Sequence, residues 1–300
     1  SAASDVYKRQ VLGHEFVGRV VETGPEVRDV RIGDQVFSSD FTACGHCHWC
    51  GRSQHWHCDH RRFFGTGELF GPAAQGAQAE YVLVPHADTT LHRLAPGCPP
   101  EAAILMADNL ATAWSALERA RVEPGEVVAV IGGGPVGLLT VHCALSIGAG
   151  RVIIVEPTDA RRAVAESQGA IGATPDTAVD VIDGLTSGDG ADVVIEAVGI
   201  NPTLDAGLEL VRRGGRLVSV GAHGADAWNM PVADSFADEL SLSFVIGNPI
   251  GTRARLQQMV VGGALDPTFV IDERISIEAA PAAYESLIRH ERLKVVINQW

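Results

Sequence analysis

The stretch that decides the fold is EVVAVIGGGPVGLLTVHCALSIGAGRVIIVEP, residues 126–157. It begins with an apolar run, Val127–Ile131, typical of a strand that is buried on both faces, and a second such run follows at Val152–Val155. Between the two runs, a glycine-rich turn leads into a helical stretch. This order of strand, turn, helix and strand predicts a βαβ unit with parallel strands.

The turn of this unit has the spacing of a dinucleotide-binding site. Gly132, Gly134 and Gly137 stand in the pattern G-x-G-x-x-G, which provides a tight turn, close approach of a pyrophosphate and close helix packing. The helix that follows would direct free amide groups at the phosphates. A glycine-rich turn without a ligand is the alternative, but an acid at the end of the second strand, Glu156, favours the dinucleotide.

Glu156 also favours NAD over NADP. A carboxylate at this position accepts hydrogen bonds from the ribose hydroxyls of NAD and repels a 2′-phosphate. Arg161 and Arg162 leave NADP open as the alternative, because a guanidinium can hold a phosphate. Otherwise these arginines would cover the adenosine from the solvent side.

The alternation of strands and helices continues beyond this unit. Further strands are predicted at Ala191–Glu196, Arg216–Val220 and Ser241–Ile246, with helical stretches between them, as at residues 201–213. Such alternation predicts an α/β fold with a doubly wound parallel sheet of the Rossmann type. A helix over residues 278–288 and a strand at 293–297 end the chain.

The sequence suggests four regions. Residues 1–10 show neither strand nor helix periodicity and are expected to be a non-native scar. Residues 11–108 are rich in short strands and turns, and residues 109–246 are the doubly wound region. Residues 247–300 are too few for a domain of their own, so we expect them to return to the rest of the protein.

Four of the six cysteines are clustered: Cys44, Cys47, Cys50 and Cys58, in CGHCHWCGRSQHWHC. Gaps of two, two and seven residues allow four thiolates to surround one tetrahedral ion, which predicts a structural zinc site. Four reduced cysteines without a metal are the alternative. Histidines in the same stretch could replace a cysteine, although the sulfur set is complete without them. They are His46, His48, His55, His57 and His60.

Composition narrows the choice of partners. A formal net charge of −14 without a cluster of Lys and Arg disfavours nucleic acids and anionic membrane surfaces. No apolar run reaches the length of a membrane span, and the first residues do not read as a signal peptide. We therefore expect a cytoplasmic protein with a small-molecule substrate.

In these motifs and their order, the sequence resembles the medium-chain dehydrogenase/reductase family, and within it the zinc-dependent alcohol dehydrogenases. The stretch GHEFVGRVVETG, residues 13–24, matches the zinc signature of that family. The cysteine cluster, the glycine turn and the final strand follow in the family's order. The resemblance implies a mainly-β, GroES-like catalytic domain, incomplete at its N-terminus, joined to a Rossmann domain.

The resemblance also implies the active-site residues. His14 would be a ligand of a catalytic zinc ion, and Glu15 would be its neighbour or a transient ligand. Asp108 stands where many members have a cysteine ligand, although it could instead cap the helix that follows. Thr112 and Val136 match positions that touch the nicotinamide.

Two further expectations concern the cofactor, where the resemblance supplies the residue, and the substrate pocket. Lys294 matches a basic residue that reaches the pyrophosphate. Asp40, Phe41 and the loop at residues 63–76 are where we expect the walls of the substrate pocket.

The implied activity is reversible hydride transfer between a zinc-bound alcohol or polyol, as its alkoxide, and NAD. In the same family, a zinc-independent enone or quinone reductase that uses NADPH is the alternative. The family's first catalytic ligand, a cysteine, lies further upstream than this chain reaches, because no cysteine precedes Cys44. A truncated, inactive fragment that binds zinc and dinucleotide is therefore a third reading. Members of the family form dimers or tetramers, and we expect a homo-oligomer joined near residues 241–246.

Overall fold

The computed structural model describes residues 10–66, 68 and 70–298. Contacts divide the chain into two compact units. The first consists of Ser1–Ala111 and Asn248–Trp300, and the second of Thr112–Gly247. Residues 1–10, predicted to be a non-native scar, lie outside the described residues apart from Gln10. The structure therefore does not test that prediction.

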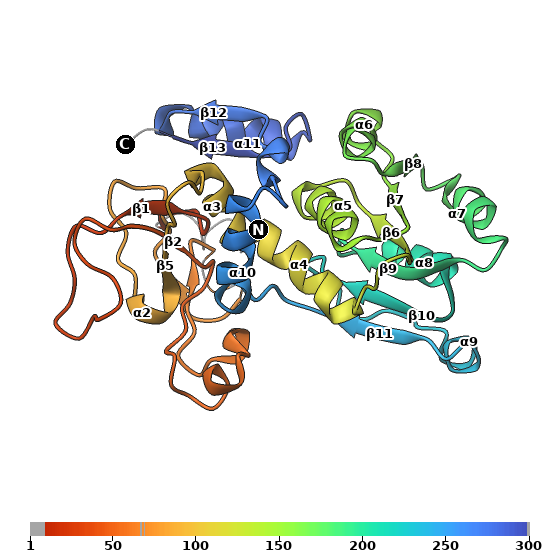
Figure 1. Ribbon diagram of the computed structural model, residues 1–300, viewed down its shortest axis with the longest axis horizontal. Helices are drawn as coiled ribbons and strands as arrows, with labels where there is room; N and C mark the ends of the chain where they lie inside the picture. Colours follow the sequence, from red (N-terminus) through yellow and green to blue (C-terminus); the bar gives the residue numbers. More distant parts are fainter. Residues whose placement is uncertain (1–9, 67, 69, 299–300) are drawn as a thin grey trace. The chain divides into compact units, whose positions relative to one another are not determined.

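The second unit is built on a six-stranded parallel sheet (Figure 1). Its strands are β6 (Val127–Ile131), β7 (Arg151–Val155), β8 (Ile171–Ala173), β9 (Ala191–Glu196), β10 (Val211–Ser219) and β11 (Ser241–Phe244). They lie in the order β8-β7-β6-β9-β10-β11. Counted from β6, this is the order 3-2-1-4-5-6 of a doubly wound dinucleotide-binding sheet, which confirms the predicted Rossmann fold.

Helices fill the connections between these strands. They are α4 (Asn109–Ala120), which leads into β6, α5 (Pro135–Ile147), α6 (Asp159–Ser167), α7 (Ala178–Thr186), α8 (Asn201–Leu210) and α9 (Val232–Ala237). The helix predicted at residues 201–213 ends at Leu210, and the next three residues join β10 instead. They do so because Val211 pairs with Ala191 of β9, and a register shift separates that pair from the pairing at Arg216.

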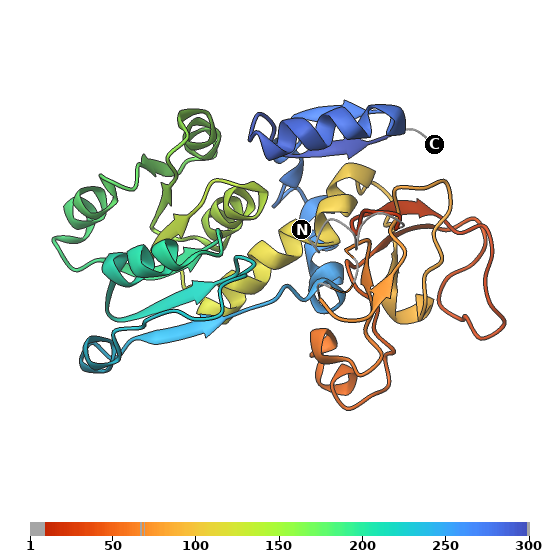
Figure 2. The ribbon, with the colours of Figure 1, turned by 180° about the vertical axis from the view of Figure 1, so that it is seen from behind.

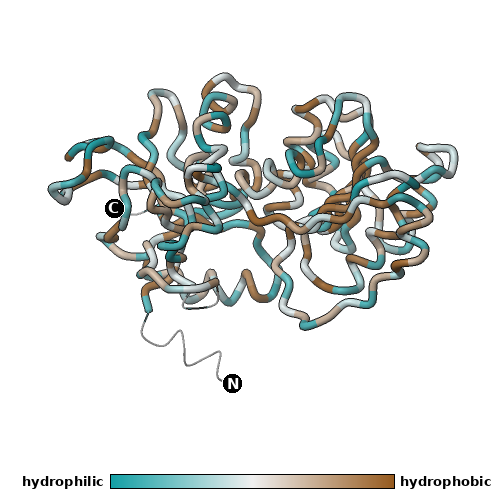
Figure 3. The backbone as a smooth tube through the Cα atoms, turned by 90° about the horizontal axis from the view of Figure 1, so that it is seen from below, coloured by the Kyte–Doolittle hydropathy of each residue, from teal (hydrophilic) through white to brown (hydrophobic). Residues whose placement is uncertain are grey.

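The core of this unit explains why the strands could be found in the sequence. Ile153 of β7 and Val194 of β9 are fully buried, and apolar side chains from α7 and β10 pack on the same cluster. Figure 3 shows the apolar segments gathered in the strands of this sheet. Strands that are covered on both faces need continuous apolar runs, and those runs are the signal that the sequence carries.

The first unit contains an antiparallel sheet of β1 (Val17–Arg19), β2 (Gln35–Ser38) and β5 (Leu91–Arg93) in the order β1-β2-β5. Val20, Val36 and Leu91 form its buried centre. This mainly-β unit matches the predicted GroES-like domain. Its other early elements are short: η1 (Cys50–Arg52), η2 (His55–His57), β3 (Phe63–Phe64), β4 (Ala73–Ala74), α2 (Ala87–Thr90) and α3 (Pro100–Met106).

The C-terminal segment belongs to the first unit. Its elements are α10 (Pro249–Val261), η3 (Pro267–Val270), β12 (Glu273–Ile275), η4 (Ile277–Ala279), α11 (Ala280–Ile288) and β13 (Val295–Ile297). Figure 2 shows α11 beside the parallel pair β12–β13. On α10, the Gln257 side chain accepts a hydrogen bond from the Ala95 amide at 2.8 Å. No helix in the described part of the chain combines the length and the apolar character needed to cross a membrane.

Candidate active site

His14 and Asp108 meet in the first unit, although 94 positions separate them in the sequence. The His14 Nε2 atom lies 3.2 Å from Asp108 Oδ2. The His14 ring packs at 5.4 Å from the ring of Phe63 on β3, which fixes the direction in which it points. Asp108 directly precedes α4, where a carboxylate is also favoured by the helix dipole. The two interpretations of Asp108, ligand and helix cap, both stay predictions.

Glu15 lies beside this pair and is held by the C-terminal segment. The Lys294 ammonium group donates a short hydrogen bond to Glu15 Oε2 and a second one to Asn109 Oδ1 at 3.0 Å. The side chains of Lys294 and Glu15 are 14% and 13% exposed, so the pair is largely shielded from water. Lys294 therefore contacts the acid of the candidate active site, a partner that the sequence did not suggest.

Asp40 adds a third carboxylate to the same region. Its backbone amide donates to the carbonyl of Ala107 at 3.1 Å, and its carbonyl accepts from the Phe64 amide at 3.0 Å. The side chain is buried, and its Oδ1 atom has no hydrogen-bond partner among the described residues. Burial, followed by the negative charge of Asp108, raises the pKa of Asp40 well above its usual range.

The charge balance of the cluster fits a bound cation. Burial lowers the pKa of His14, but the hydrogen bond with Asp108 and the charges of Asp108, Glu15 and Asp40 outweigh it and raise the pKa to about 9. The cluster thus favours a positive charge at His14. Glu15 Oε1 is also buried without a partner among the described residues. An imidazole, unpartnered carboxylate oxygens and a need for positive charge suit a zinc ion.

The four clustered cysteines converge as the sequence predicts. The Sγ atoms of Cys44, Cys47, Cys50 and Cys58 all lie within 4.8 Å of one another. Backbone amides point at the sulfurs: the Cys44 amide lies 3.2 Å from Cys58 Sγ, and the Cys47 amide lies 3.4 Å from Cys44 Sγ. Amide donors, first that of Cys50, lower the pKa of Cys47 to about 6. Four sulfurs that receive amide hydrogen bonds are the donor set of a closed structural zinc site.

Side-chain contacts hold the cysteine-rich lobe, residues 44–61, in place. The Arg61 guanidinium lies 3.9 Å above the ring of Trp56 and donates to the backbone carbonyls of Trp56 and Phe70. The His55 ring lies 3.1 Å from Asn248 Oδ1, at the start of α10. The contact between His55 and Asn248 ties the cysteine-rich lobe to the C-terminal segment of the same unit.

In the second unit, the glycine turn has the geometry that a dinucleotide needs. Gly132 has a φ of +102°, a conformation that side chains other than glycine's rarely adopt. A Cβ atom on Gly137 would lie 1.8 Å from the Gly132 carbonyl oxygen, so no larger residue fits at that position. Gly134 precedes α5, whose first turn begins with Pro135. The free amides of that turn form the anion-binding end of the helix.

Glu156 lies at the end of β7, beside this turn. Its Oε2 atom accepts a hydrogen bond from the Gly133 amide at 2.7 Å, and its Oε1 atom accepts from the Thr158 amide at 2.9 Å. Each carboxylate oxygen can accept a further bond, so these contacts orient the group and leave it capacity for a ribose. Arg162 donates to the Glu156 carbonyl at 2.6 Å and pairs with Asp159.

Three other predicted cofactor contacts, Thr112, Val136 and Arg161, lie in the same unit. Thr112 stands in α4 next to Gly247, where a Cβ would come within 2.3 Å of the Thr112 hydroxyl oxygen. Val136 is in the first turn of α5, and its carbonyl accepts from the Thr140 hydroxyl at 2.8 Å. Arg161 lies on α6, with its Cβ within 3.2 Å of the place that a Cβ on Gly133 would take.

Comparison with known proteins agrees with this geometry. The alcohol dehydrogenase GroES-like domain family matches residues 3–95, and the zinc-binding dehydrogenase family matches residues 135–261. A probable zinc-binding alcohol dehydrogenase of Mycobacterium tuberculosis is 35% identical over 274 residues, which cover 91% of this chain and 70% of that protein. This chain belongs to the zinc-dependent alcohol dehydrogenases of the medium-chain dehydrogenase/reductase family.

Solved structures of zinc-dependent dehydrogenases share the fold. The alcohol dehydrogenase from Thermus sp. ATN1 matches with a TM-score of 0.92 and 36% identity, over 96% of this chain and 83% of that one. A provisionally named zinc-binding dehydrogenase from Sinorhizobium meliloti 1021, bound to NADP, matches with a TM-score of 0.79 and 30% identity, over 91% and 79%. The second protein binds NADP, so the family as such does not decide between the two cofactors.

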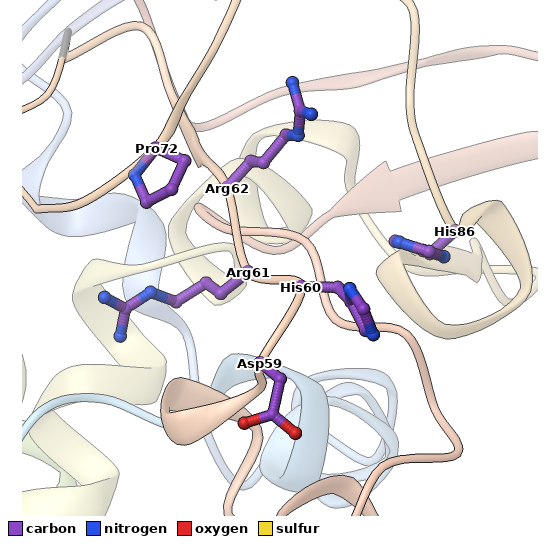
Figure 4. A pocket seen from close by; sticks show the side chains of 6 residues that line it. All are labelled: Asp59, His60, Arg61, Arg62, Pro72 and His86. Carbon is purple, nitrogen blue, oxygen red and sulfur yellow. The ribbon is translucent and has the colours of Figure 1, made fainter.

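The first unit also contains a cavity that the family resemblance did not predict. A cavity of about 250 Å³ lies beside the cysteine-rich lobe. Its lining residues are Asp59, His60, Arg61, Arg62, Pro72 and His86 (Figure 4). The ring centroids of His60 and His86 lie 6.4 Å apart, with the ring planes tilted by 46°, whereas the Arg61 side chain points away from both rings.

The sequence patterns did not single out two members of this candidate site. They indicate Asp40 as a pocket wall, and they do not indicate Asn109, which binds Lys294. For Asp40, a signal was present, because it is an acid that follows the buried strand β2 and precedes buried Phe41. For Asn109 the sequence offers no signal apart from its place next to Asp108.

Proposed function

We propose that the protein is an NAD-linked zinc dehydrogenase that reversibly oxidises a small alcohol or polyol to its carbonyl product. The observation that carries the proposal is the meeting of His14 and Asp108 at 3.2 Å, beside the unpartnered carboxylate oxygens of Glu15 and Asp40. In this proposal the first unit carries the metal chemistry and the second unit, with its glycine turn, binds the dinucleotide.

His14 and Asp108 would hold the zinc ion. Bound there, zinc would supply Lewis acidity to the substrate oxygen and so ease loss of the hydroxyl proton, while nicotinamide would accept the hydride. Asp108 also keeps the His14 ring in place through its Oδ2 atom. Lys294 holds Glu15 by an ion pair, so that this second carboxylate stays close to His14 while its charge is balanced.

We further propose that NAD is preferred over NADP. The proposal is supported by Glu156, which is buried to 5% exposure at the end of β7 and oriented by two amide donors. A carboxylate fixed in this way favours ribose hydroxyls and repels a 2′-phosphate. Arg162, one of the two arginines that could contact a 2′-phosphate, already pairs with Asp159 and donates to a backbone carbonyl.

The test is reduction of NAD and of NADP by the zinc-loaded protein with a panel of primary, secondary and polyhydroxy alcohols, followed by absorbance of the reduced nicotinamide. We expect activity with NAD, and we expect Asp108→Asn to lower kcat by at least about 100-fold because it weakens a metal ligand. The exposed acid Glu22 provides the control, since Glu22→Gln should leave kcat unchanged. Turnover that survives in Asp108→Asn would refute the assigned role.

One observation favours a second candidate, a protein that binds zinc and dinucleotide without turnover. Among the described residues, no third ligand atom of a His, Cys, Asp or Glu side chain forms a group with His14 and Asp108 within 4.8 Å. A catalytic zinc site normally has three protein ligands and one open position. Binding of NADH without reduction of NAD by any alcohol in the panel would establish this candidate in place of the first.

A further inference from the structure

The cysteine-rich lobe contains a second group of metal-ligating atoms that the structural zinc site does not use. Ligand atoms of Cys44, His46 and His60 all lie within 4.8 Å of one another. Cys44 belongs to both groups, whereas the two histidines are exposed and lie outside the four-sulfur set. The rings of His46 and His60 have their centroids 6.2 Å apart.

The His46 ring is oriented as metal-binding imidazoles commonly are. Its Nδ1 atom lies 2.9 Å from the Cys44 carbonyl oxygen, so Nδ1 carries the proton and donates it. This hydrogen bond fixes the tautomer and leaves the Nε2 lone pair for a metal. His60 is fixed at its backbone, because its amide donates to Cys58 Sγ at 3.4 Å.

The charge of the lobe favours a second cation. Four thiolates around one Zn²⁺ leave two excess negative charges, and a thiolate such as that of Cys44 can bridge two ions. Arg61, which could oppose a cation, is drawn away by its stacking on Trp56 and its carbonyl contacts. His60 also lines the cavity of about 250 Å³ described above, together with His86 (Figure 4).

We infer that Cys44, His46 and His60 form a second, exchangeable zinc site that shares a thiolate with the structural site. One sulfur and two imidazole nitrogens are donors that Zn²⁺ accepts, and three protein ligands leave a fourth position open to water. An ion that binds there is already bound to Cys44, which is also a ligand of the four-cysteine site. The site therefore provides an entry point through which the structural zinc is loaded. This inference is independent of the proposed dehydrogenase activity.

The test counts zinc at equilibrium rather than activity. The whole protein, with reduced cysteines, is dialysed against a buffered excess of free Zn²⁺, and zinc per chain is measured by elemental analysis. We expect the double variant His46→Ala/His60→Ala to bind about one zinc fewer than the parent protein, because it keeps only one of the three ligands. The matched control, His48→Ala/His57→Ala, removes two histidines of the same lobe that lie outside the group and should match the parent.

The rate of loading supplies a second readout. After removal of zinc, Co²⁺ is added and its uptake into the four-thiolate site is followed by the thiolate-to-cobalt absorption. Loss of His46 and His60 should slow this uptake at least about tenfold, with the final absorption unchanged. Equal zinc counts in parent and double variant would overturn the inference. So would loss of the four-cysteine metal in the double variant, because the histidines would then be part of the structural site.

Discussion

At the scale of single residues, the glycine turn leaves no space for a side chain at Gly137. A Cβ on Gly137 would overlap the Gly132 carbonyl oxygen at 1.8 Å, and backbone rather than a flexible side chain would have to move. We expect Gly137→Ala to weaken NADH binding by at least about tenfold and to destabilise the protein by about 1–3 kcal/mol. Fluorescence titration with NADH and thermal unfolding would measure the two effects.

Gly184 is the matched control for this substitution. It lies inside α7, has no atom within 4 Å of a built Cβ, and does not adopt a positive φ. Gly184→Ala should therefore stabilise the protein by about 0.5–1 kcal/mol and leave NADH binding unchanged. Similar losses of binding in both variants would mean that the close approach at Gly137 is not what the cofactor site requires.

His92 on β5 should make the stability of the protein depend on pH. Burial, together with the charges of Arg253 and Arg93, lowers its pKa to about 4 from 6.5. The unfolded chain therefore gains a proton below pH 6.5 while the folded protein stays neutral until about pH 4, so stability falls as the pH is lowered through this window. Between pH 7 and pH 5 the loss is at most roughly 2 kcal/mol, because solvent reaches part of the ring and screens the charges that lower its pKa.

His92→Phe isolates this contribution. The ring of His92 packs edge-on against Phe37 at 5.4 Å, and a phenyl ring keeps that contact without titrating. Denaturant unfolding at pH 7 and pH 5 should show a smaller difference for the variant than for the parent protein. An equal difference in both proteins would show that His92 does not control the acid side of the stability curve.

At the scale of elements, the strands of the parallel sheet were the easiest features to predict. β6 and β9 have the predicted bounds because they are buried on both faces, so that each residue has to be apolar or paired. The bounds of β10 were wrong at its start, since the pairing of Val211 with Ala191 depends on a partner strand rather than on the local sequence. Apolar runs in the local sequence indicate which strands are buried, whereas strand pairing depends on residues that are distant in the sequence.

The predicted interface of the homo-oligomer lies at the edge strand β11. It is the last strand of the sheet, and Phe244 is 55% exposed on it, while Phe236 just before it is 85% exposed. An exposed apolar sheet edge is a template for pairing with another copy. Phe244→Glu should convert the oligomer to a monomer, as measured by light scattering coupled to size exclusion.

Leu185 serves as the control for this edge. It is 39% exposed on α7, away from β11 in the strand order, so Leu185→Glu should leave the oligomer intact. If the parent protein is a monomer, or if both variants stay oligomeric, β11 is not the interface.

At the scale of the whole molecule, the residues of the candidate active site show what sequence patterns cannot supply. No local pattern in the sequence connects His14 to Asp108, which meet at 3.2 Å, and only the family resemblance predicts that they lie together. The same resemblance predicted that Lys294 reaches a pyrophosphate, whereas its contacts in the first unit are Glu15 and Asn109. Long-range contacts of polar side chains leave no periodic signal, because each involves a single residue.

The residues predicted to bind zinc and those predicted to bind the dinucleotide lie in different units of the chain. All candidate zinc ligands lie in the unit of Ser1–Ala111 and Asn248–Trp300, whereas the glycine turn and Glu156 lie in Thr112–Gly247. The turn owes its shape to its own backbone, and the apolar core of its sheet contains no predicted metal ligand. We therefore expect removal of zinc by a chelator to abolish alcohol oxidation while NADH binds with a Kd within about threefold of that of the loaded protein.

Zinc-loaded and chelated samples would be titrated with NADH by calorimetry, with Gly137→Ala as the reference for a damaged turn. Readdition of Zn²⁺ should restore turnover, because the unit that holds the dinucleotide has stayed folded throughout. A loss of NADH affinity on chelation as large as that in Gly137→Ala would contradict the independence of the two units. It would mean that the metal sites of the first unit help to shape the cofactor site of the second.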